Sequence, residues 1–415
     1  MNKPLHFETR AIHEGIKDHD WEGATLPPIF QSAAHFHDTA DNLSQTFAGD
    51  LPDHIYMRLT NPTNRFLEEK LASLESGRAA VVMASGMAAI SNACMTLLRA
   101  GDEFVASSSL FMSTYALFTN IFKKYGITVR LADPLNRDEI AAKITDKTRF
   151  VYMETITNPG MEIPDLENIA GLAHEKGVPL MVDNTLASPW LCRPIELGAD
   201  IVLHSTTKYF SGHGGALGGV VVDAGKFNWD TDRFSDFAPF VAQKGNLAFL
   251  HRMFKEHHVN FGTTAAPLHS FLTVLGLATM GVRMERHMEN ALQTARFLQD
   301  HPKVQWVNFI GFSDHPCHRM AKKQFGGKGF GTMLTFGLAD QKACFRLVDN
   351  LSMILNLANL GDCKTLIIHP YSSQYVSFPR ELKDRLADPC LLRLSVGIEH
   401  IEDICGDLSA ALEKV

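Results

Sequence analysis

A lysine follows a short apolar run and precedes a glycine-rich loop. Residues 201–204 are typical of a buried strand, and Ser205, Thr206, Thr207 and Lys208 come directly after them. In open α/β sheets, ligands bind at the carboxyl ends of the strands. An ammonium group that loses solvation there has a lowered pKa and becomes an amine nucleophile. The sequence therefore predicts a reactive lysine at the edge of a sheet.

A second apolar run, residues 178–182, ends in Asp183. One lysine and one aspartate at adjacent strand ends suggest pyridoxal phosphate, because this cofactor forms a Schiff base with a lysine and its ring nitrogen needs an acidic partner. In isolation, Asp183-Asn184-Thr185 is more typical of a turn or a helix cap. The cofactor hypothesis therefore depends on Lys208 and Asp183 lying at neighbouring strand ends.

Three further positions carry polar groups that suit such a site. Gly86 and Met87 open a helical segment after a strand, where free N–H groups could bind a phosphate, although such turns are routine in α/β folds. Asn158, in the turn Asn158-Pro159-Gly160, could face a ligand at the same sheet edge. Arg393 stands between leucines, so either it captures a carboxylate or it forms an internal salt bridge.

Short apolar runs alternate with helical segments such as residues 110–125 and 168–175. This alternation predicts a mainly parallel sheet with helices on both faces, which is an α/β fold. The expected strands are residues 80–84, 103–107, 128–131, 150–154, 180–183, 201–204 and 220–222.

The patterning divides the chain into three parts. Residues 1–60 lack sustained periodicity and are expected to form an arm on a partner's surface. Residues 61–257 are expected to form the large domain. Residues 258–415 are expected to form a smaller C-terminal α/β domain, with one helix over residues 267–298, a strand at 332–336 and a loop-rich stretch from 360 to 395.

Composition indicates an ordinary soluble enzyme. The 415 residues are 45% apolar, with a net charge of −7 and no basic block, which argues against nucleic acid and anionic membranes as partners. No apolar stretch is long enough for a membrane helix or signal peptide, so a cytoplasmic location is expected. Seven scattered cysteines form no Cys-x-x-Cys pair, and the histidine pairs lack a completing ligand set, so no metal site is predicted.

Taken together, these residues resemble the Cys/Met-metabolism family of pyridoxal-phosphate enzymes, which includes cystathionine γ-synthase, cystathionine and methionine lyases, and O-acetylhomoserine sulfhydrylase. The resemblance implies fold type I, the aspartate aminotransferase-like architecture, and a homotetramer of two dimers with shared active sites. The segments that carry it are residues 56–63, 85–87, 154–159, 182–185, 204–209 and 392–397.

The resemblance also implies roles for individual residues. Lys208 would form the Schiff base and Asp183 would pair with the pyridine nitrogen. Asn158 would lie beside the phenolic oxygen of the cofactor, and Arg393 would grip the substrate α-carboxylate, with Asn359 as a second substrate contact. The phosphate would be held by Ser205, Thr207, Gly86 and Met87, with Tyr56 and Arg58 arriving from the neighbouring subunit.

Within the family, residues 212–229, 315–323 and 359–370 look most like O-acetylhomoserine sulfhydrylases, which are transferases of methionine biosynthesis and transsulfuration. The implied reaction is γ-replacement on an O-acyl-homoserine, with O-acetylhomoserine as the expected substrate, by sulfide or a thiol to give homocysteine or methionine. A methionine or homocysteine γ-lyase is the alternative. A non-catalytic binding protein that keeps the pyridoxal-phosphate fold is the alternative from another class.

Two segments depart from the family pattern. Many members carry Tyr-Gly-x-Thr, with the tyrosine stacked on the cofactor, where this chain has Phe111-Met-Ser-Thr. Phe111 can stack but cannot transfer a proton. It is still expected, with Lys208 and Tyr56, to be a catalytic residue, and to contact the cofactor. Residues 371–375, Tyr-Ser-Ser-Gln-Tyr, replace the usual Ala-Ser-x-Thr-His. Because of these two changes, the sequence does not decide how the leaving group is recognised, or whether the enzyme catalyses replacement or elimination.

Overall fold

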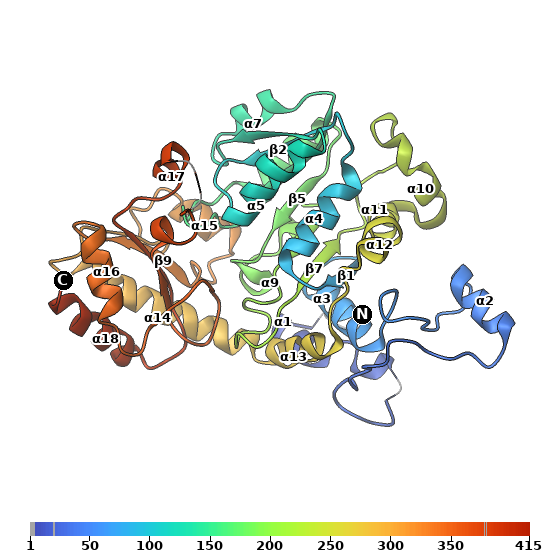
Figure 1. Ribbon diagram of the computed structural model, residues 1–415, viewed down its shortest axis with the longest axis horizontal. Coiled ribbons are helices and arrows are strands. Elements are labelled where there is room, and N and C mark those ends of the chain that lie inside the picture. Colours follow the sequence, from blue (N-terminus) through green and yellow to red (C-terminus); the bar gives the residue numbers. More distant parts are fainter. Residues whose placement is uncertain (1–4, 20, 377, 379) are drawn as a thin grey trace.

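The computed structural model describes residues 5–19, 21–376, 378 and 380–415. In this part of the chain, seven strands form a mixed sheet in the order β1-β7-β6-β5-β4-β2-β3 (Figure 1). Strands β6, β5, β4, β2 and β3 are parallel, and β7 is antiparallel to both of its neighbours. The strands are β1 Ala79–Met83, β2 Glu103–Ser107, β3 Thr128–Ala132, β4 Thr148–Glu154, β5 Leu180–Asp183, β6 Ile201–His204 and β7 Gly219–Asp223.

Helices cover both faces of this sheet. Because successive side chains of a strand point to opposite faces, Val182 packs with α3 and α8 on one face while Met181 packs with α4 and α11 on the other. The predicted α/β fold class is therefore confirmed. The covering helices and those near them are α3 Pro62–Leu74, α4 Gly86–Leu97, α7 Arg137–Lys143, α8 Leu166–Glu175, α9 Ser188–Leu191, α10 Ala238–Lys244, α11 Ala248–Arg252 and α12 Val259–Phe261.

A smaller sheet lies beside the large one, in the order β10-β11-β12-β9-β8 among the described residues (Figure 1). Its apolar face packs against α14, α16 and α18. The placement of domain boundaries at residues 60 and 257 stays a prediction. This part contains β8 Trp306–Asn308, β9 Met333–Gly337, β10 Leu355–Asn356, β11 Leu366–Ile368, β12 Leu391–Ser395, α14 Met280–Gln299, α15 His318–Gln324, α16 Gln341–Asp349, α17 Arg380–Leu386 and α18 Ile401–Glu413.

The prediction of one continuous helix over residues 267–298 is wrong. Helix α13 (Pro267–Ala278) ends before Thr279, and α14 begins at Met280. The guanidinium of Arg283 bonds to the carbonyl oxygen of Gly276 at 2.7 Å and to that of Tyr209 at 2.9 Å. The break therefore lets one side chain join α13 to the loop that follows Lys208, a tertiary contact that periodicity does not report.

One other prediction is confirmed with a difference in detail, and one is incomplete. The helical stretch over residues 110–125 consists of α5 (Met112–Ala116), a π-helical turn η2 (Leu117–Ile121) and α6 (Phe122–Lys124). The stretch over residues 360–395, expected to be rich in loops, contains β11, α17 and β12. The described chain has no helix that is long and apolar enough to span a membrane.

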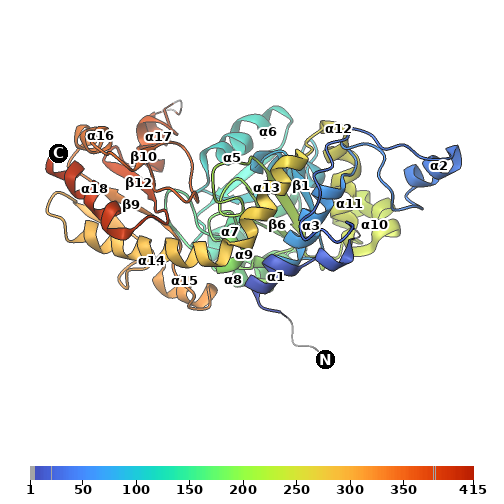
Figure 2. The same cartoon turned by 90° about the horizontal axis from the view of Figure 1, so that it is seen from below.

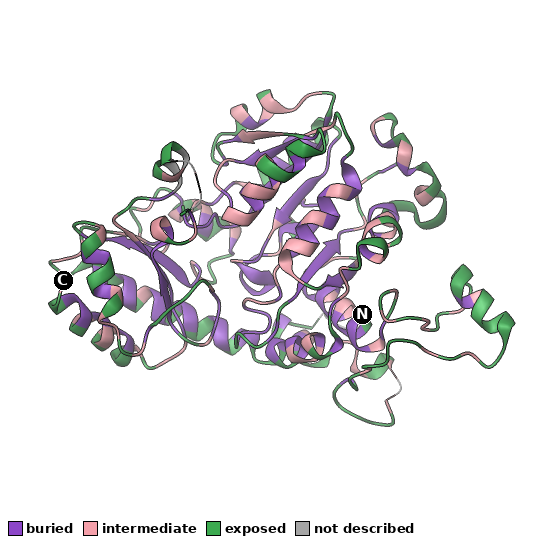
Figure 3. Ribbon diagram, viewed as in Figure 1, coloured by how far each residue is buried: buried purple, intermediate pink, exposed green. Residues whose placement is uncertain are grey.

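The N-terminal part has two different components. Helix α1 (Phe7–His13) packs on the body of the same chain: Phe7 is buried, and Lys70 Nζ donates to the carbonyl oxygen of Ala11 at 3.1 Å. Residues 33–57, by contrast, run outward and back, with α2 (Ala40–Ala48) at the tip (Figure 2). Figure 3 shows this arm as mostly exposed. The side chains of Phe36 and Phe47 are 91% and 60% exposed, so the arm leaves large apolar groups uncovered.

Candidate active site

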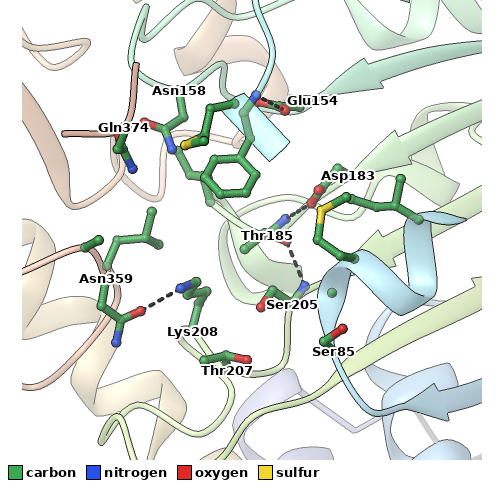
Figure 4. Close-up of a pocket in the computed structure, with 18 of the residues that line it drawn as sticks. Ser85, Glu154, Asn158, Asp183, Thr185, Ser205, Thr207, Lys208, Asn359 and Gln374 are labelled. Atoms are coloured by element: carbon green, nitrogen blue, oxygen red, sulfur yellow. Dashed lines mark hydrogen bonds between the residues drawn. The ribbon is translucent and has the colours of Figure 1, made fainter. Parts of the chain in front are cut away.

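A cavity of about 540 Å³ lies at the carboxyl ends of β4, β5 and β6. The amino end of α4 closes one side, and residues 358–360 with β12 of the smaller sheet close another. Figure 4 shows the polar side chains that converge on it. The parallel strands place their polar ends together, as the sheet-edge rule anticipates.

Lys208 projects into this cavity. Its Nζ donates a hydrogen bond of 2.6 Å to Oδ1 of Asn359 (Figure 4). Burial, with a smaller contribution from the charge of Arg393, lowers the pKa of Lys208 to about 8. Near neutral pH a usable fraction of this amine is therefore unprotonated, as a nucleophile requires.

Two buried carboxyl groups stand at the ends of neighbouring strands. Asp183 accepts a hydrogen bond of 2.9 Å from the backbone N–H of Thr185, and Glu154 accepts one of 2.8 Å from the backbone N–H of Phe111. Burial raises the pKa of both, and the charge of Asp183 raises the pKa of Glu154 further. Asp183 makes no ion pair within the described chain, so it can accept a hydrogen bond from a cationic ligand.

A second layer of buried groups fixes the strand ends that carry these residues. The Glu75 carboxylate hydrogen-bonds to His204 Nε2 and accepts a bond of 2.8 Å from Asn184 Nδ2. The hydroxyl of Thr185 accepts a bond of 2.9 Å from the backbone N–H of Ser205. Asn184 and Thr185 follow Asp183 directly, and Ser205 follows His204, the last residue of β6. The two strand ends are thus tied to each other through side chains.

The amino end of α4 offers an anion site. The Ser85 hydroxyl accepts from Ala88 N at 3.1 Å and its carbonyl oxygen accepts from Ala89 N at 3.1 Å, so the first-turn amides of Gly86 and Met87 are left for a ligand. A Cβ on Gly86 would lie 2.8 Å from Cβ of Ser205, so glycine permits this close approach.

Thr207, which also lines the cavity, exchanges hydrogen bonds with its own loop. Its hydroxyl accepts from Gly218 N at 3.1 Å and lies 3.3 Å from Gly218 O. These contacts fix the hydroxyl beside the cavity and hold the glycine-rich loop against the segment that carries Lys208.

Arg393 points from β12 into the cavity and is 2% exposed. Its Nη1 donates to Asn158 Oδ1 and its Nη2 donates to the carbonyl oxygen of Asn359, both at 3.1 Å. Its Nε is buried and unpaired among the described residues. Burial lowers the pKa of Arg393 to about 10, so the group stays cationic at neutral pH. Neither acceptor is a carboxylate, which leaves the positive charge for a ligand.

Most of the candidate residues lie around this single cavity. Tyr56 and Arg58 do not line it: Tyr56 is 44% exposed, and Arg58 Nη1 donates to the carbonyl oxygen of Val259 at 2.7 Å. The candidates that do line it are Lys208, Asp183, Ser205, Thr207, Gly86, Met87, Asn158, Phe111, Arg393 and Asn359.

Sequence reasoning missed five polar residues of the cavity as site residues: Ser85, Glu154, Thr185, Ser373 and Gln374. Glu154 ends a strand next to β5, so the rule that pointed to Asp183 applies to it as well. Thr185 is hidden in a turn-like triplet. Gln374 lies in a loop, and the only sequence signal for it was that residues 371–375 differ from the family pattern.

The cavity fits pyridoxal phosphate. Asp183 supplies a buried carboxylate for a ring nitrogen, the first turn of α4 supplies free amides for a phosphate, and Lys208 supplies an amine for an aldehyde. Asn158 lies across the cavity from Ser205 in Figure 4, and Arg393 hydrogen-bonds to Asn158, which leaves room for an amino-acid carboxylate beside the cofactor.

Comparisons with known proteins agree with this geometry. The chain is 39% identical over 424 residues to the homocysteine synthase of Schizosaccharomyces pombe, covering 98% of both proteins. It is 38% identical over 410 residues to the L-methionine gamma-lyase of Fusobacterium nucleatum subsp. polymorphum, again covering 98% of both. A Campylobacter jejuni crystal structure that contains N′-pyridoxyl-lysine-5′-monophosphate superposes with a TM-score of 0.94 at 31% identity, covering 99% of this chain and 100% of that one.

The family model for Cys/Met metabolism pyridoxal-phosphate-dependent enzymes matches residues 8–413. The match spans both sheets and every residue of the cavity described above. With near-complete coverage of relatives that are more than 30% identical, the chain belongs to the Cys/Met metabolism family of pyridoxal-phosphate-dependent enzymes.

Proposed function

We propose that the protein catalyses γ-replacement on an O-acyl-homoserine, with O-acetylhomoserine as the preferred ester and sulfide or a thiol as the nucleophile. The observation that carries this proposal is the joint placement of Lys208 and Arg393 in one cavity, linked through Asn359. An amine with a lowered pKa and a cation free to bind a carboxylate are what an α-amino acid substrate requires. The homocysteine synthase of Schizosaccharomyces pombe supports the choice of reaction.

The residues of the chain divide the work. Arg393 binds the substrate α-carboxylate through its fork and so orients the Cα–H bond. Lys208 takes the proton from Cα and moves protons at the neighbouring carbons as general base and acid. Asp183 holds the ring nitrogen in its protonated form. Bound pyridoxal phosphate supplies the electron sink that stabilises negative charge at Cα.

The overall change is balanced without an oxidant. The Cγ–O bond breaks with its electron pair on oxygen, which releases acetate, and a lone pair of hydrosulfide forms the Cγ–S bond of homocysteine. Lys208 removes one proton from Cβ and returns it. With a thiol such as methanethiol in place of hydrosulfide, the same steps would give methionine.

A γ-lyase activity is the second candidate, because the lyase of Fusobacterium nucleatum subsp. polymorphum is as similar as the synthase. Elimination from the same site would release 2-oxobutyrate and ammonia instead of homocysteine. The two reactions share every step until a nucleophile arrives at Cγ. The products formed with and without sulfide therefore distinguish them.

We also propose that the protein acts in the cytoplasm as a homotetramer built from two dimers. Tyr56 and Arg58 lie at the base of the exposed arm and outside the cavity of their own chain. In a dimer they would reach the cofactor phosphate of the neighbouring subunit. The uncovered Phe36 and Phe47 support burial of the arm against a second copy.

The test is to incubate the purified holoenzyme with O-acetylhomoserine, with and without sulfide, and to quantify homocysteine and 2-oxobutyrate. We expect homocysteine to dominate when sulfide is present. Lys208→Ala should abolish both products while the protein stays folded by circular dichroism. Lys226→Ala, which removes an exposed lysine of the same domain, is the matched control. Near-normal turnover by Lys208→Ala would refute the proposal.

A further inference from the structure

Gln374 is the residue of the divergent segment whose polar group is free to meet a ligand. Both Ser373 and Gln374 line the cavity. The hydroxyl of Ser373 already donates to the carbonyl oxygen of His369 at 2.6 Å, within its own turn. Among the described residues, none hydrogen-bonds to the Gln374 side chain. Figure 4 shows its amide end turned into the cavity, on the side of Asn158 and away from Ser85 and Ser205.

The cavity that this amide enters is lined mainly by apolar side chains. An apolar cavity with few polar groups uses those groups to fix the orientation of its ligand. The proposed ring, phosphate and α-carboxylate contacts occupy Asp183, the α4 amides and Arg393, so Gln374 is left for the γ-substituent of the substrate. The apolar lining of the cavity includes Met87, Ile90, Phe111, Met112, Ile156 and Leu360.

The lining that its own chain gives the cavity also offers few groups that could protonate a leaving group, and the Tyr56 of a neighbouring copy is proposed to bind the cofactor phosphate. Its described lining contains no tyrosine, histidine or cysteine, and its only carboxyl side chains are Glu154 and Asp183. Glu154 binds the amide of Phe111, and Asp183 is committed to the ring nitrogen. Lys208 is already used to transfer protons at the carbon atoms of the substrate. A thiolate, whose conjugate acid has a pKa of about 8.5, needs a proton in order to leave well, whereas a carboxylate, with a pKa of about 4, does not.

We propose that Gln374 donates a hydrogen bond to the acyl carbonyl oxygen of a homoserine ester and thereby selects acyloxy leaving groups over thiolates. As the Cγ–O bond breaks, its electron pair moves onto the acyloxy group, and the amide N–H strengthens its bond to the forming carboxylate. No proton is transferred to the leaving group. The inference rests on the proposed γ-replacement and names the substrate class of that same site.

The test compares two substrates that differ only at Cγ. O-acetylhomoserine has an acyl carbonyl, whereas 2-amino-4-chlorobutanoate loses chloride, which needs neither a proton nor a carbonyl contact. Gln374→Leu keeps roughly the size of the side chain. It should lower kcat/KM for the ester by about tenfold or more, whereas kcat/KM for the chloro substrate should stay within about twofold of the wild-type value. Val376→Ala, an exposed position in the same segment, is the control. Bound-cofactor absorbance confirms that each variant is loaded.

The outcomes separate the inference from the proposed function. A loss confined to the ester, together with wild-type turnover of methionine below about one hundredth of the ester rate, supports the inference, because a thiolate without an acid leaves slowly. Unchanged ester turnover in Gln374→Leu, an equal loss on both substrates, or efficient use of methionine by the wild type would overturn it. Failure of the wild type to form homocysteine from the ester and sulfide would instead refute the proposed function.

Discussion

Asn359 binds Lys208 and Arg393 through different atoms, and its Oδ1 lies 2.6 Å from Lys208 Nζ. The lysine follows a strand of the large sheet, while Asn359 precedes β11 of the small one. The backbone carbonyl oxygen of Asn359 accepts from Arg393 Nη2. A single loop residue therefore couples the amine to the carboxylate-binding cation across the two sheets. Only the contact with Lys208 uses the side chain of Asn359. A substitution at position 359 can therefore remove this contact and keep the backbone contact with Arg393.

The lowered pKa of Lys208 predicts how cofactor capture depends on pH. Only the unprotonated amine attacks an aldehyde, so the rate should rise about tenfold per pH unit below the pKa and level off above it. With the pKa of Lys208 at about 8, the midpoint should fall near pH 8. Stopped-flow absorbance after mixing apoprotein with pyridoxal phosphate from pH 7 to pH 10 measures it. A midpoint near 10.5, the ordinary value for lysine, would contradict the expectation.

Replacement of Asn359 should shift that midpoint downward. The Asn359 side chain accepts a hydrogen bond from the ammonium form of Lys208 and so favours it. Asn359→Ala removes this acceptor while the backbone bond to Arg393 remains, so the midpoint should fall by about one pH unit. Asn356→Ala, at an exposed position three residues earlier, is the matched control. An unaltered midpoint in Asn359→Ala would show that the contact does not govern the charge of the lysine.

Arg393→Lys should raise KM for O-acetylhomoserine with little effect on cofactor binding. Lysine keeps the charge but not the planar fork, so bidentate capture of the α-carboxylate is lost. The bonds to Asn158 and to the Asn359 backbone are disturbed as well. We expect kcat/KM to fall by about 100-fold, because a charge-assisted hydrogen bond of the fork, worth about 1.5–3 kcal/mol, is lost. Steady-state kinetics, with cofactor absorbance as the loading control, tests this. An unchanged KM would mean that Arg393 does not bind the α-carboxylate of the substrate.

Phe111→Tyr should change the ratio of replacement to elimination. The substitution adds a phenol to a cavity whose described lining has none, and so supplies a proton donor and acceptor near the γ-substituent. We expect the ratio of homocysteine to 2-oxobutyrate to change by roughly threefold or more, since general acid catalysis contributes at least that much. Phe111→Leu changes the ring without adding a hydroxyl and serves as the control. If both variants gave the wild-type ratio, position 111 would have no part in this choice.

Features that depend on interactions between residues close in the sequence could be predicted, whereas features that depend on contacts between distant residues could not. Strands β2, β5 and β6 have the predicted bounds, because burial on both faces selects apolar runs that the sequence displays. The break at Thr279 could not be predicted from periodicity, which does not report long-range contacts such as the bond of Arg283 to the carbonyl oxygen of Tyr209. The same holds for the site. Lys208 and Asp183 follow from strand ends, whereas the orientation of Gln374 depends on how a loop folds over the cavity.

The buried carboxylate of Glu75 should matter more for stability than its position outside the cavity suggests. It hydrogen-bonds to His204 and Asn184, and all three side chains are almost fully buried. Glu75→Leu would leave a buried imidazole and a buried amide without their partner. Loss of one partner of a buried pair costs about 3 kcal/mol or more, because the remaining polar groups stay desolvated.

We therefore expect Glu75→Leu to lower the thermal unfolding midpoint of the holoenzyme by several degrees and to weaken pyridoxal phosphate binding, because β5 and β6 carry Asp183 and Lys208 at their ends. Glu69→Leu, in the helix α3 that Glu75 follows directly, is the matched control: Glu69 pairs with Arg65 and His19 near the surface, where such pairs contribute at most about 1 kcal/mol each. Differential scanning fluorimetry with cofactor titration measures both effects. Equal midpoints for the two variants would mean that the link between the strand ends does not stabilise the site.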